Sequence, residues 1–446
     1  AWPRGIYMTA QTAGIGWFGI IRLGTVQAAI GAMVMLATSL LNRVMVVEYA
    51  IAAAVPAALV AWHYGVQLSR PLWGHRSDRS ARRSTWITVG LGILALGAMV
   101  AVDATILMAG SGIFPVLLAI AGFSLIGLGV GMSGTALLAL LASRVAVERK
   151  PAAAAISWTM MVAGIVVAAG VSGAYLDPFS ETRLAIVCGS VVLIAFCLAM
   201  FALRGLERNS QPVALAKSEQ ASSSFTDALR DIWQDGQARR FTWFVFISML
   251  AYSMQDLILE PFAGFVFAMT PGESTQLSGL QHSGILAGML AAGLGGSLYA
   301  KRYGPNLKRW IVLGCFGSAV MLAGLSMAAS TGMGWPLKAN VFGLGVANGI
   351  FAVAAVSAML GLATDGKASG EGARMGVWGA SQAVAFGTGG LLGAVIVDQL
   401  RSIMGQDAIA FRWVFAIEAI MFVIAALVAT GTSMTRAVQI RKAIEA

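Results

Sequence analysis

The sequence predicts an all-α integral membrane protein with twelve transmembrane helices in two six-helix halves and both ends in the cytoplasm. Three observations predict this fold: a very low content of charge, twelve long apolar runs and an uneven distribution of basic residues. The chain has 446 residues, of which 58% are hydrophobic and 11% charged, whereas a soluble domain carries about 25% charged residues. Because so few charges cannot cover a surface that faces water, most of the surface must face lipid.

The first element of the prediction is the set of apolar runs. A transmembrane helix needs about 20 mostly apolar residues, and twelve runs reach that length. Their approximate limits are 20–45, 51–72, 85–105, 113–143, 152–174, 183–204, 240–269, 279–300, 309–329, 336–363, 374–398 and 410–430.

The loop charges predict the orientation. If the start, the end and every second loop share one side, that side holds 25 of the 30 Lys and Arg residues. The opposite side holds the other five, which are Arg43, Arg183, Lys338, Arg401 and Arg412. The basic side should be cytoplasmic by the positive-inside rule. The net charge of +10 is spread in short clusters between apolar runs, which favours an anionic membrane surface over nucleic acid as its partner.

Three pairs of motifs recur at similar spacing and indicate a duplicated chain. The pairs are Gly127-Leu128-Gly129-Val130 with Gly343-Leu344-Gly345-Val346 (offset 216), Trp158 with Trp378 (offset 220), and Asp177 with Asp398 (offset 221). They predict two parallel six-helix halves, 1–204 and 240–446, an arrangement similar to that of the major facilitator superfamily.

A polar linker, about 205–239, joins the predicted halves. In its second part Phe225, Leu229, Ile232 and Trp233 recur at helical spacing, and Ser224 with Asp227 can cap a helix start. We expect a short helix along the cytoplasmic interface. A solvated linker with chance periodicity is the alternative.

The loop after the second run carries a motif. It reads Gly74-His75-Arg76-Ser77-Asp78-Arg79-Ser80-Ala81-Arg82-Arg83 and resembles the superfamily signature G-x-x-x-D-R followed by paired basic residues. In this gate motif we expect Gly74 to permit a tight turn and Asp78 to face a helix N-terminus. We expect Arg79, Arg82 and Arg83 to pair across a cytoplasmic gate. A plain basic loop is the alternative reading. The matching loop after the eighth run has Ala300 where the acid would stand.

Charged residues inside the apolar runs are few, and such residues mark functional sites in membranes. Arg43 and Glu48 end the first run, and Asp256 and Glu260 lie one helical turn apart in the seventh. Arg43 and Glu48 are predicted to pair with each other, with Asp256 or with Glu260. Such a network would be a lock on the non-cytoplasmic side, a ligand contact, or a structural ion pair between the first and seventh helices. Pro261 should kink the seventh helix.

Two histidines fall in the apolar region: His63 in the second helix and His282 at the start of the eighth. A neutral imidazole is a good metal ligand in an apolar site, and an imidazole that is satisfied by a backbone carbonyl is the alternative for each. Cys188, Cys197 and Cys315 show no disulfide or metal-ligand spacing. The sequence contains no nucleotide-binding loop, H-E-x-x-H or G-x-S-x-G motif in a suitable context, so we expect neither an enzyme nor a nucleotide cofactor.

Several segments resemble a narrower family. They are Leu41 to Glu48, Ser69 to Gly74, Leu259 to Gly264 and Gln281 to Gly284. These segments look like the bacteriochlorophyll delivery family, the PucC and LhaA-like branch of the major facilitator superfamily. The nearest likeness is to the subgroup encoded beside bacteriochlorophyll synthase.

The resemblance implies a role in handling bacteriochlorophyll, or a late precursor, and in assembling light-harvesting complexes. It implies bacteriochlorophyll synthase and light-harvesting antenna polypeptides as partners, besides membrane lipids, and a place in the photosynthetic intracytoplasmic part of the inner membrane. A bound pigment would need an axial ligand for its magnesium, although the protein itself would hold no metal site. On chemistry alone the candidates are His63, His282, Asn42, Glu48 and Glu260.

Two other functions compete with pigment handling. A proton-coupled transporter of a small solute should carry more polar groups in its central helices than this chain does. An enzyme subunit working beside the synthase should carry an acidic cluster for magnesium and diphosphate, and we find no such cluster in the sequence.

Overall fold

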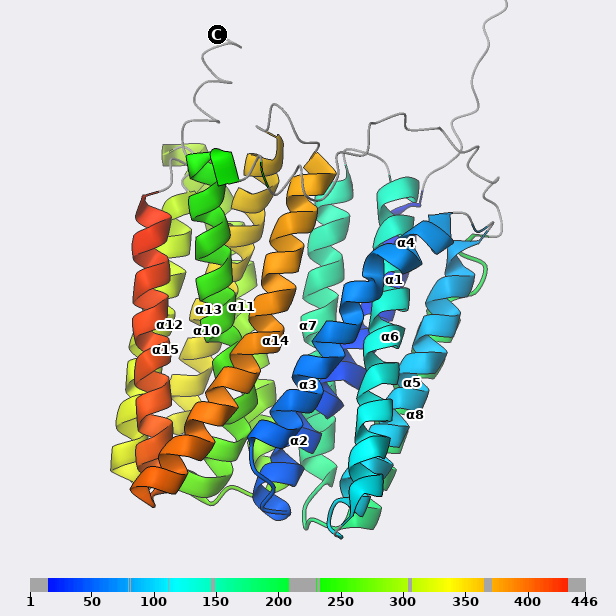
Figure 1. The fold of residues 1–446 in the computed structure, drawn as a ribbon. Coiled ribbons are helices and arrows are strands. Elements are labelled where there is room, and N and C mark those ends of the chain that lie inside the picture. The colour runs from blue at the N-terminus through cyan, green and yellow to red at the C-terminus, as the bar shows by residue number, and fades with distance from the viewer. Residues whose placement is uncertain are drawn as a thin grey trace, which may run out of the picture.

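The computed structural model describes residues 15–78, 80, 82–110, 112–145, 149–207, 230, 233–303, 307–364 and 371–431. In these ranges every regular element is a helix. The helices run side by side along one common direction (Figure 1), with the first half of the chain on one side of the molecule and the second half on the other. The all-helical class predicted from the sequence is confirmed for the described residues.

The first half contains eight numbered α-helices, some of which join end to end into one long helical segment. The first segment consists of α1 (Trp17–Met35), the π-helix η1 (Leu36–Leu40), α2 (Leu41–Arg43) and the π-helix η2 (Val44–Glu48). The second consists of α3 (Ala54–Val66), the 3-10 turn η3 (Gln67–Ser69) and α4 (Arg70–Asp78). Single helices follow: α5 (Arg83–Leu107), α6 (Ile113–Arg144), α7 (Lys150–Tyr175) and α8 (Glu181–Leu203).

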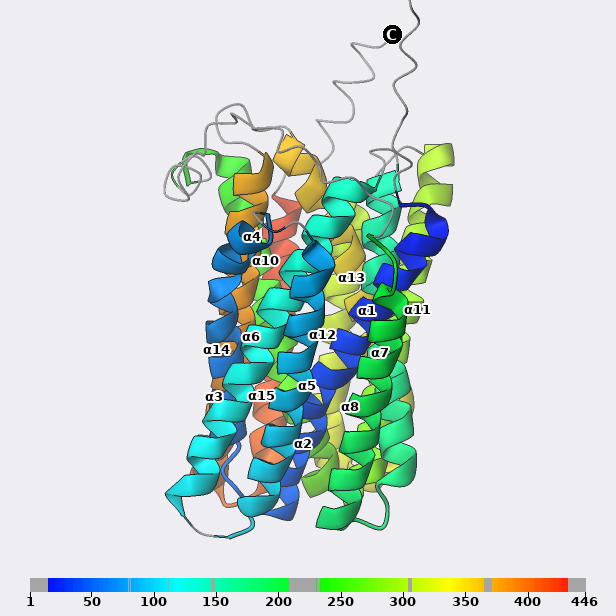
Figure 2. The same cartoon turned by 90° about the vertical axis from the view of Figure 1, so that its right-hand side faces the viewer.

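The second half is built from single long helices. They are α10 (Gly236–Phe267), α11 (Pro271–Tyr303), α12 (Leu307–Thr331) with the 3-10 turn η5 (Gly332–Gly334), α13 (Leu337–Thr364), α14 (Glu371–Met404) and α15 (Asp407–Thr430). The halves meet where α7 packs on α11 and α3 on α14. Both views show α3 beside α14 (Figures 1 and 2).

Ten helical segments in the described part of the chain are long and apolar enough to cross a membrane, so the protein is a multi-pass membrane protein. The segment of α3 to α4 and the helix α11 do not meet that standard. The α3 helix ends after 13 residues, and α11 carries the polar side chains of Glu273, Gln276, Gln281 and His282. Both nevertheless pack along their neighbours: α3 on α6 and α14, and α11 on α7 and α13.

The predicted limits of α11 and α14 need correction. The α11 helix begins at Pro271 instead of residue 279, so His282 lies three turns inside the helix and not at its start. The α14 helix continues to Met404 instead of 398. The first turns of α11 are polar, but Ser274, Thr275 and Ser278 are buried, and Ser274 and Ser278 contact the other half. A hydropathy pattern therefore misses a helix whose polar turns are stabilised by tertiary contacts.

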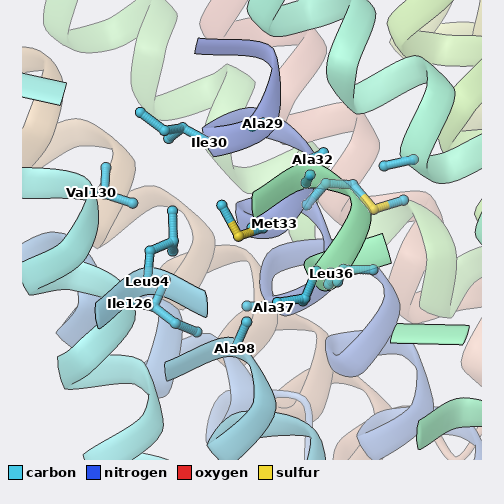
Figure 3. Close-up of a cluster of buried hydrophobic side chains, with 14 of the residues drawn as sticks. Ala29, Ile30, Ala32, Met33, Leu36, Ala37, Leu94, Ala98, Ile126 and Val130 are labelled. Carbon is cyan, nitrogen blue, oxygen red and sulfur yellow. The ribbon is translucent and has the colours of Figure 1, made fainter. Parts of the chain in front are cut away.

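Small and aliphatic side chains fill the core of the first half. Figure 3 shows Met33 and Ala37 from the first segment close to Leu94 and Ala98 of α5 and Ile126 of α6. The helices α5 and α6 approach closely, since a Cβ on Gly97 would lie 2.6 Å from the backbone nitrogen of Ile126. Glycine at such positions permits the tight helix packing typical of membrane proteins.

Aromatic rings fill the core of the second half instead. The ring of Phe262 in α10 lies 4.9 Å from that of Phe415 and 5.5 Å from that of Phe411, both in α15. Phe351 of α13 lies 5.5 Å from Phe422 of α15. These edge-on and tilted contacts lie in the range in which aromatic pairs attract. The two halves therefore share a helix arrangement but use different packing.

The duplication is visible in how the first segment of each half ends. Ala50 and Ala268 are the two described non-glycine residues with positive φ, at 52° and 51°. The amide of Ile51 donates to the Met45 carbonyl at 2.9 Å, and that of Met269 donates to the Ala263 carbonyl at 3.2 Å. Each bond joins residues six apart in sequence, one more than the long bond of a Schellman motif, and each is made by the amide directly after the left-handed residue. The two motifs are 218 residues apart.

A second pair of contacts has the same offset. A Cβ on Gly127 would lie 2.7 Å from the His63 carbonyl, and one on Gly345 would meet the Gln281 carbonyl. Both pairs of residues are 218 apart, so 218 is the register of the repeat in these helices. The predicted pairing of Gly127 with Gly343 is therefore two residues out.

Candidate functional site between the two halves

Arg43 joins the two halves at the end where the first segment stops. Its Nη1 donates to Glu48 Oε1 at 2.7 Å, its Nε to Ser274 Oγ at 3.1 Å and its Nη2 to the Met269 carbonyl at 2.8 Å. The Arg43 side chain is 2% exposed and that of Glu48 28%. The ion pair therefore lies within the first segment and not between the first and seventh helices. The guanidinium connects to the second half through neutral acceptors.

Tyr49 follows Glu48 directly and shares its surroundings. Burial, and then the nearby charges of Glu181 and Glu48, raise the pKa of Tyr49 to about 12. The hydroxyl therefore stays neutral at physiological pH and adds no negative charge beside Arg43.

Glu260 of α10 is buried between the halves and is 2% exposed. Ser39 Oγ donates to Glu260 Oε1 at 2.5 Å, and Thr275 Oγ1 donates to Oε2 at 3.4 Å. Ser278 Oγ lies 3.0 Å from Ser39 Oγ. Because the single hydroxyl proton of Ser39 goes to the carboxylate, Ser278 must be the donor in that contact. Hydroxyl groups from both halves thus enclose Glu260, while Asp256 takes no part in this cluster.

Asn42 and Pro261 are explained by one contact. Pro261 has no N–H, so the carbonyl of Leu257 four residues earlier loses its helical partner. Asn42 Nδ2 donates to that carbonyl at 2.7 Å across the interface between the halves. The α10 helix continues through Pro261 to Phe267. Proline therefore provides an acceptor inside α10 for a donor from the other half.

Two aspartates connect the halves reciprocally. Asp177, after α7, accepts from Thr270 Oγ1 at 2.5 Å and from the Gly272 amide at 3.1 Å, so it caps the start of α11 in the other half. Asp398 in α14 accepts from the amides of Ala53 and Ala54 at 3.1 and 2.8 Å, at the start of α3. A carboxylate at a helix N-terminus satisfies free amides and the helix dipole. The sequence paired these two aspartates, and their reciprocal roles needed the structure.

His282 lies in α11, one turn after Ser278. Its Nδ1 lies 2.9 Å from the carbonyl of Ser278. A carbonyl can only accept, so Nδ1 carries the proton and Nε2 keeps a free lone pair. Ser278 lies one turn before His282, and it contacts Ser39 of the other half. His282 is 9% exposed, and with Nδ1 bonded to the Ser278 carbonyl its Nε2 is the ring atom that could accept from or bind another group.

His63 has the opposite arrangement. Gln67 Oε1 accepts from Arg70, so the Gln67 amide nitrogen is the atom that lies 2.7 Å from His63 Nε2. An amide nitrogen can only donate, so Nε2 of His63 accepts this hydrogen bond and Nδ1 carries the proton. That Nδ1 is buried without a hydrogen-bond partner in the described part of the chain. His63 therefore has no lone pair to offer to a ligand.

An aromatic group lines the same interface at the level of His282. The ring of Phe386 in α14 lies 5.6 Å from that of Tyr64 in α3 and 5.6 Å from that of Tyr252 in α10. Asp256 lies close enough to Tyr64, Tyr252 and His282 to interact with them electrostatically. This part of the interface therefore combines flat apolar surfaces with the carboxyl group of Asp256 and the imidazole of His282.

The gate motif is described only in part. Gly74 lies inside the helix α4, so the predicted turn at this glycine is wrong: the helix runs on to Asp78 and the chain turns afterwards. Arg82 precedes α5 in extended conformation, and Arg83 Nη1 donates to the Ala139 carbonyl of its own half at 2.8 Å. Arg79 and the side chain of Asp78 lie outside the described residues, as does most of the predicted linker helix. Trp233 is described, and its ring lies 6.3 Å from that of Trp243.

Sequence reasoning missed the groups that make the contacts between halves. Ser39, Ser274, Ser278, Tyr64 and Phe386 carry no motif and resemble ordinary helix residues. The polar run that begins α11 was a usable signal, since several hydroxyl residues in a row rarely face lipid. Pro261 is a sequence signal for a free acceptor at Leu257, four residues before it, but its partner Asn42 needed the structure.

Comparisons with known proteins agree with this picture. The family model described as PUCC protein matches residues 40–437. The "Bacteriochlorophyll synthase 44.5 kDa chain" of Rhodobacter capsulatus is 47% identical, over 95% of this chain and 97% of its own length. "Protein PucC" of Rhodobacter capsulatus is 29% identical, over 91% of this chain and 90% of its own.

Solved structures resemble the fold at low sequence identity. A mutant of the nucleoside transporter NupG has a TM-score of 0.65 and 16% identity, with 93% of this chain and 100% of that chain covered. A mutant of the peptide transporter POT, in complex with alafosfalin, has a TM-score of 0.67 and 13% identity, with 95% and 97% covered. The fold thus defines a membrane protein with the architecture of major facilitator transporters. Within that class, the chain belongs to the PucC family.

Proposed function

We propose that the protein binds bacteriochlorophyll, or a late precursor, between its two halves and assists the assembly of light-harvesting complexes beside bacteriochlorophyll synthase. In this proposal twelve helices cross the inner membrane, in its photosynthetic intracytoplasmic part, with both ends in the cytoplasm. The excess of Lys and Arg in one set of loops supports the orientation. The name of the relative at 47% identity supports the connection to bacteriochlorophyll.

The observation that carries the proposal is the imidazole of His282. Its tautomer is fixed by the Ser278 carbonyl, and such a bond to one ring nitrogen orients the other nitrogen toward a metal. It lies one turn after Ser278, which contacts Ser39 of the other half. A chlorophyll-type pigment supplies a magnesium ion that accepts one axial lone pair.

The other residues of the interface fit the same cargo. The rings of Tyr64, Tyr252 and Phe386 offer flat apolar contacts to a macrocycle. The remaining ligand candidates are engaged elsewhere: Asn42 donates to Leu257, Glu48 pairs with Arg43 and Glu260 accepts from Ser39. His282 is therefore the residue that we propose as the magnesium ligand.

We further propose that the protein is a carrier and not a catalyst. The word synthase belongs to the name of a relative, whereas membership in the PucC family and a transporter-like fold favour binding and transfer. The partners in this proposal are the synthase, the antenna polypeptides and membrane lipids, and no nucleic acid.

The test is purification of the full chain in mild detergent from a cell that makes bacteriochlorophyll. We expect an absorption spectrum with bound pigment, and synthase or antenna polypeptides among the co-purifying chains. A colourless protein without these chains, from cells that contain the pigment, would contradict the proposal.

A proton-coupled transporter of a small solute is the second candidate, and Glu260 is the observation that favours it. Its carboxyl group lies between the halves and accepts from hydroxyls of both, as a proton site that couples to a movement of the halves would. Vesicles with the purified protein would then take up a labelled solute along a proton gradient, and Glu260→Gln would stop the uptake.

A further inference from the structure

The interior of the second half holds a group of buried polar side chains that serves no contact between the halves. Gln255 in α10 and Glu418 in α15 are 0% exposed, and Asn348 in α13 is 1% exposed. Five of their polar atoms make no hydrogen bond in the described part of the chain: both oxygens of Glu418, both amide atoms of Gln255 and Nδ2 of Asn348. Such groups are rare in membrane interiors and mark a site when they converge.

Ring contacts on the same helices indicate that the three side chains converge. Phe262 contacts Phe415, and Phe351 contacts Phe422. Glu418 lies between Phe415 and Phe422, three residues after one and four before the other, so it shares their face of α15.

The partners of Glu418 follow from the same spacing. Gln255 precedes Phe262 by seven residues, and Asn348 precedes Phe351 by three, so each shares the face of its phenylalanine. Because α10 and α13 place these phenylalanines against α15 at either side of Glu418, the spacing turns Gln255 and Asn348 toward the same region of the interior as Glu418. Ser318 of α12 adds a fourth helix, since its Oγ donates to Asn348 Oδ1 at 2.7 Å.

The unpaired atoms include donors and acceptors. The amide nitrogens of Gln255 and Asn348 can only donate, and the Gln255 oxygen and an ionised Glu418 can only accept. A bare cation would satisfy the oxygens and leave the N–H groups unpaired. An apolar occupant would satisfy neither kind. Water both donates and accepts, and buried waters characteristically bridge two to four otherwise unpaired polar groups.

We infer that Glu418, Gln255 and Asn348 enclose a site for bound water in the middle of the second half. This water hydrogen-bonds the Glu418 carboxyl group to the two amides. Gln255 of this site directly precedes Asp256 in α10, and Asp256 interacts with His282. Hydration thus extends from the interface into one half of the molecule.

The first half provides the natural comparison. At the repeat register of 218, Gln255 corresponds to Ala37 and Asn348 to Val130. Both belong to the apolar cluster of Figure 3. The buried face of α8, the last helix of that half, carries aliphatic side chains and Cys188. The corresponding place in the first half is therefore dry.

Hydroxyl-radical footprinting of the full chain in detergent tests the inference, because radicals formed from bound water oxidise the side chains beside it. Phe415 and Phe422 flank the site, and Phe123 in the first half is equally buried. We expect Phe415 and Phe422 to be oxidised several-fold faster than Phe123. Equal rates for the three rings would overturn the inference.

Two variants sharpen the test. Glu418→Leu should lower the oxidation of Phe415 and Phe422 to the rate of Phe123, and Glu418→Gln, which keeps the polar atoms, should leave it high. Fast oxidation that persists in a folded Glu418→Leu protein would refute the site, and if this variant does not fold, the wild-type comparison decides. No pigment enters the measurement, so its failure leaves the proposed function untouched.

Discussion

The two halves each bury one histidine on the helix that follows their first segment, and the two imidazoles are in opposite states. His63 lies against its own half, with its ring lone pair taken by Gln67. His282 lies on the face of α11 that meets the other half. Its Nδ1–H donates to the Ser278 carbonyl, and its Nε2 is left available. The two histidines are 219 residues apart, so in sequence they resemble equivalent residues.

The difference comes from one residue of register. The repeat in these helices has an offset of 218, so His63 corresponds to Gln281 and His282 to Tyr64. Each residue turns a helix by about 100°. A shift by one therefore moves an imidazole from the interior of a half to the interface, where Tyr64 already contacts Phe386. Duplicated chains can thus acquire a site in one half only.

The largest expected effect is a loss of bound pigment when the histidine of the second half is replaced. Replacing His282 by Phe removes the proposed axial ligand and should reduce bound pigment by roughly 10- to 100-fold, the range in which even the supporting partners of metal ligands act. His63→Phe is the matched variant and should leave pigment binding nearly unchanged. The measurement is the ratio of pigment to protein absorbance after purification. Equal losses in both variants would remove the distinction between the two halves.

A smaller effect on the same ratio is expected from Leu286→Gln. Leu286 lies four residues after His282, as Gln67 lies four after His63, so the new amide can donate to Nε2 of His282 as Gln67 does to His63. Competition by one such hydrogen bond, worth about 1 kcal/mol, should lower pigment affinity by roughly fivefold. Leu286→Met keeps an apolar side chain of similar size and should bind pigment like the wild type. If both variants lose pigment equally, packing and not the lone pair is responsible.

The sequence predicted the helices well because lipid imposes long apolar runs, which a single sequence displays directly. It failed at α11, where the helicity of the turn Gly272 to Gln276 is set by contacts with Arg43 and the other half. It also paired Gly127 with Gly343 instead of Gly345, since short glycine motifs do not fix a register. Among the site residues, ring tautomers depend on neighbours such as Gln67 and Ser278, and hydrophobic periodicity carries no information about them.

A moderate effect on stability is expected where Asn42 satisfies the acceptor freed by Pro261. Asn42→Leu leaves the Leu257 carbonyl unpaired and should lower the free energy of unfolding by about 1–2 kcal/mol. In a Pro261→Ala background α10 regains an N–H for that carbonyl, so the same substitution should cost about 1 kcal/mol less. Thermal unfolding of the four proteins in detergent measures the coupling.

The control for this cycle combines Asn42→Leu with Cys197→Ser, an exposed position of α8. These two changes should add without coupling, because they share no partner. An equal coupling energy in both cycles would mean that Asn42 acts through general packing. The contact between the halves would then lose its explanation.

The smallest expected effect is on the free energy of unfolding. It concerns the left-handed residues that end the first segment of each half, where the two halves should respond alike. Ala50 and Ala268 end their segments with φ of 52° and 51°, and a left-handed conformation costs an L-residue about 1–2 kcal/mol. Glycine avoids that cost but loses more chain entropy on folding, so Ala50→Gly and Ala268→Gly should each raise the free energy of unfolding by about 0.5–1 kcal/mol. Ala58→Gly and Ala291→Gly, at exposed positions inside α3 and α11, should lower it by a similar amount. A gain at Ala50 without a gain at Ala268 would show that the two left-handed ends are not equivalent, and the register of 218 would then rest on the glycine contacts alone.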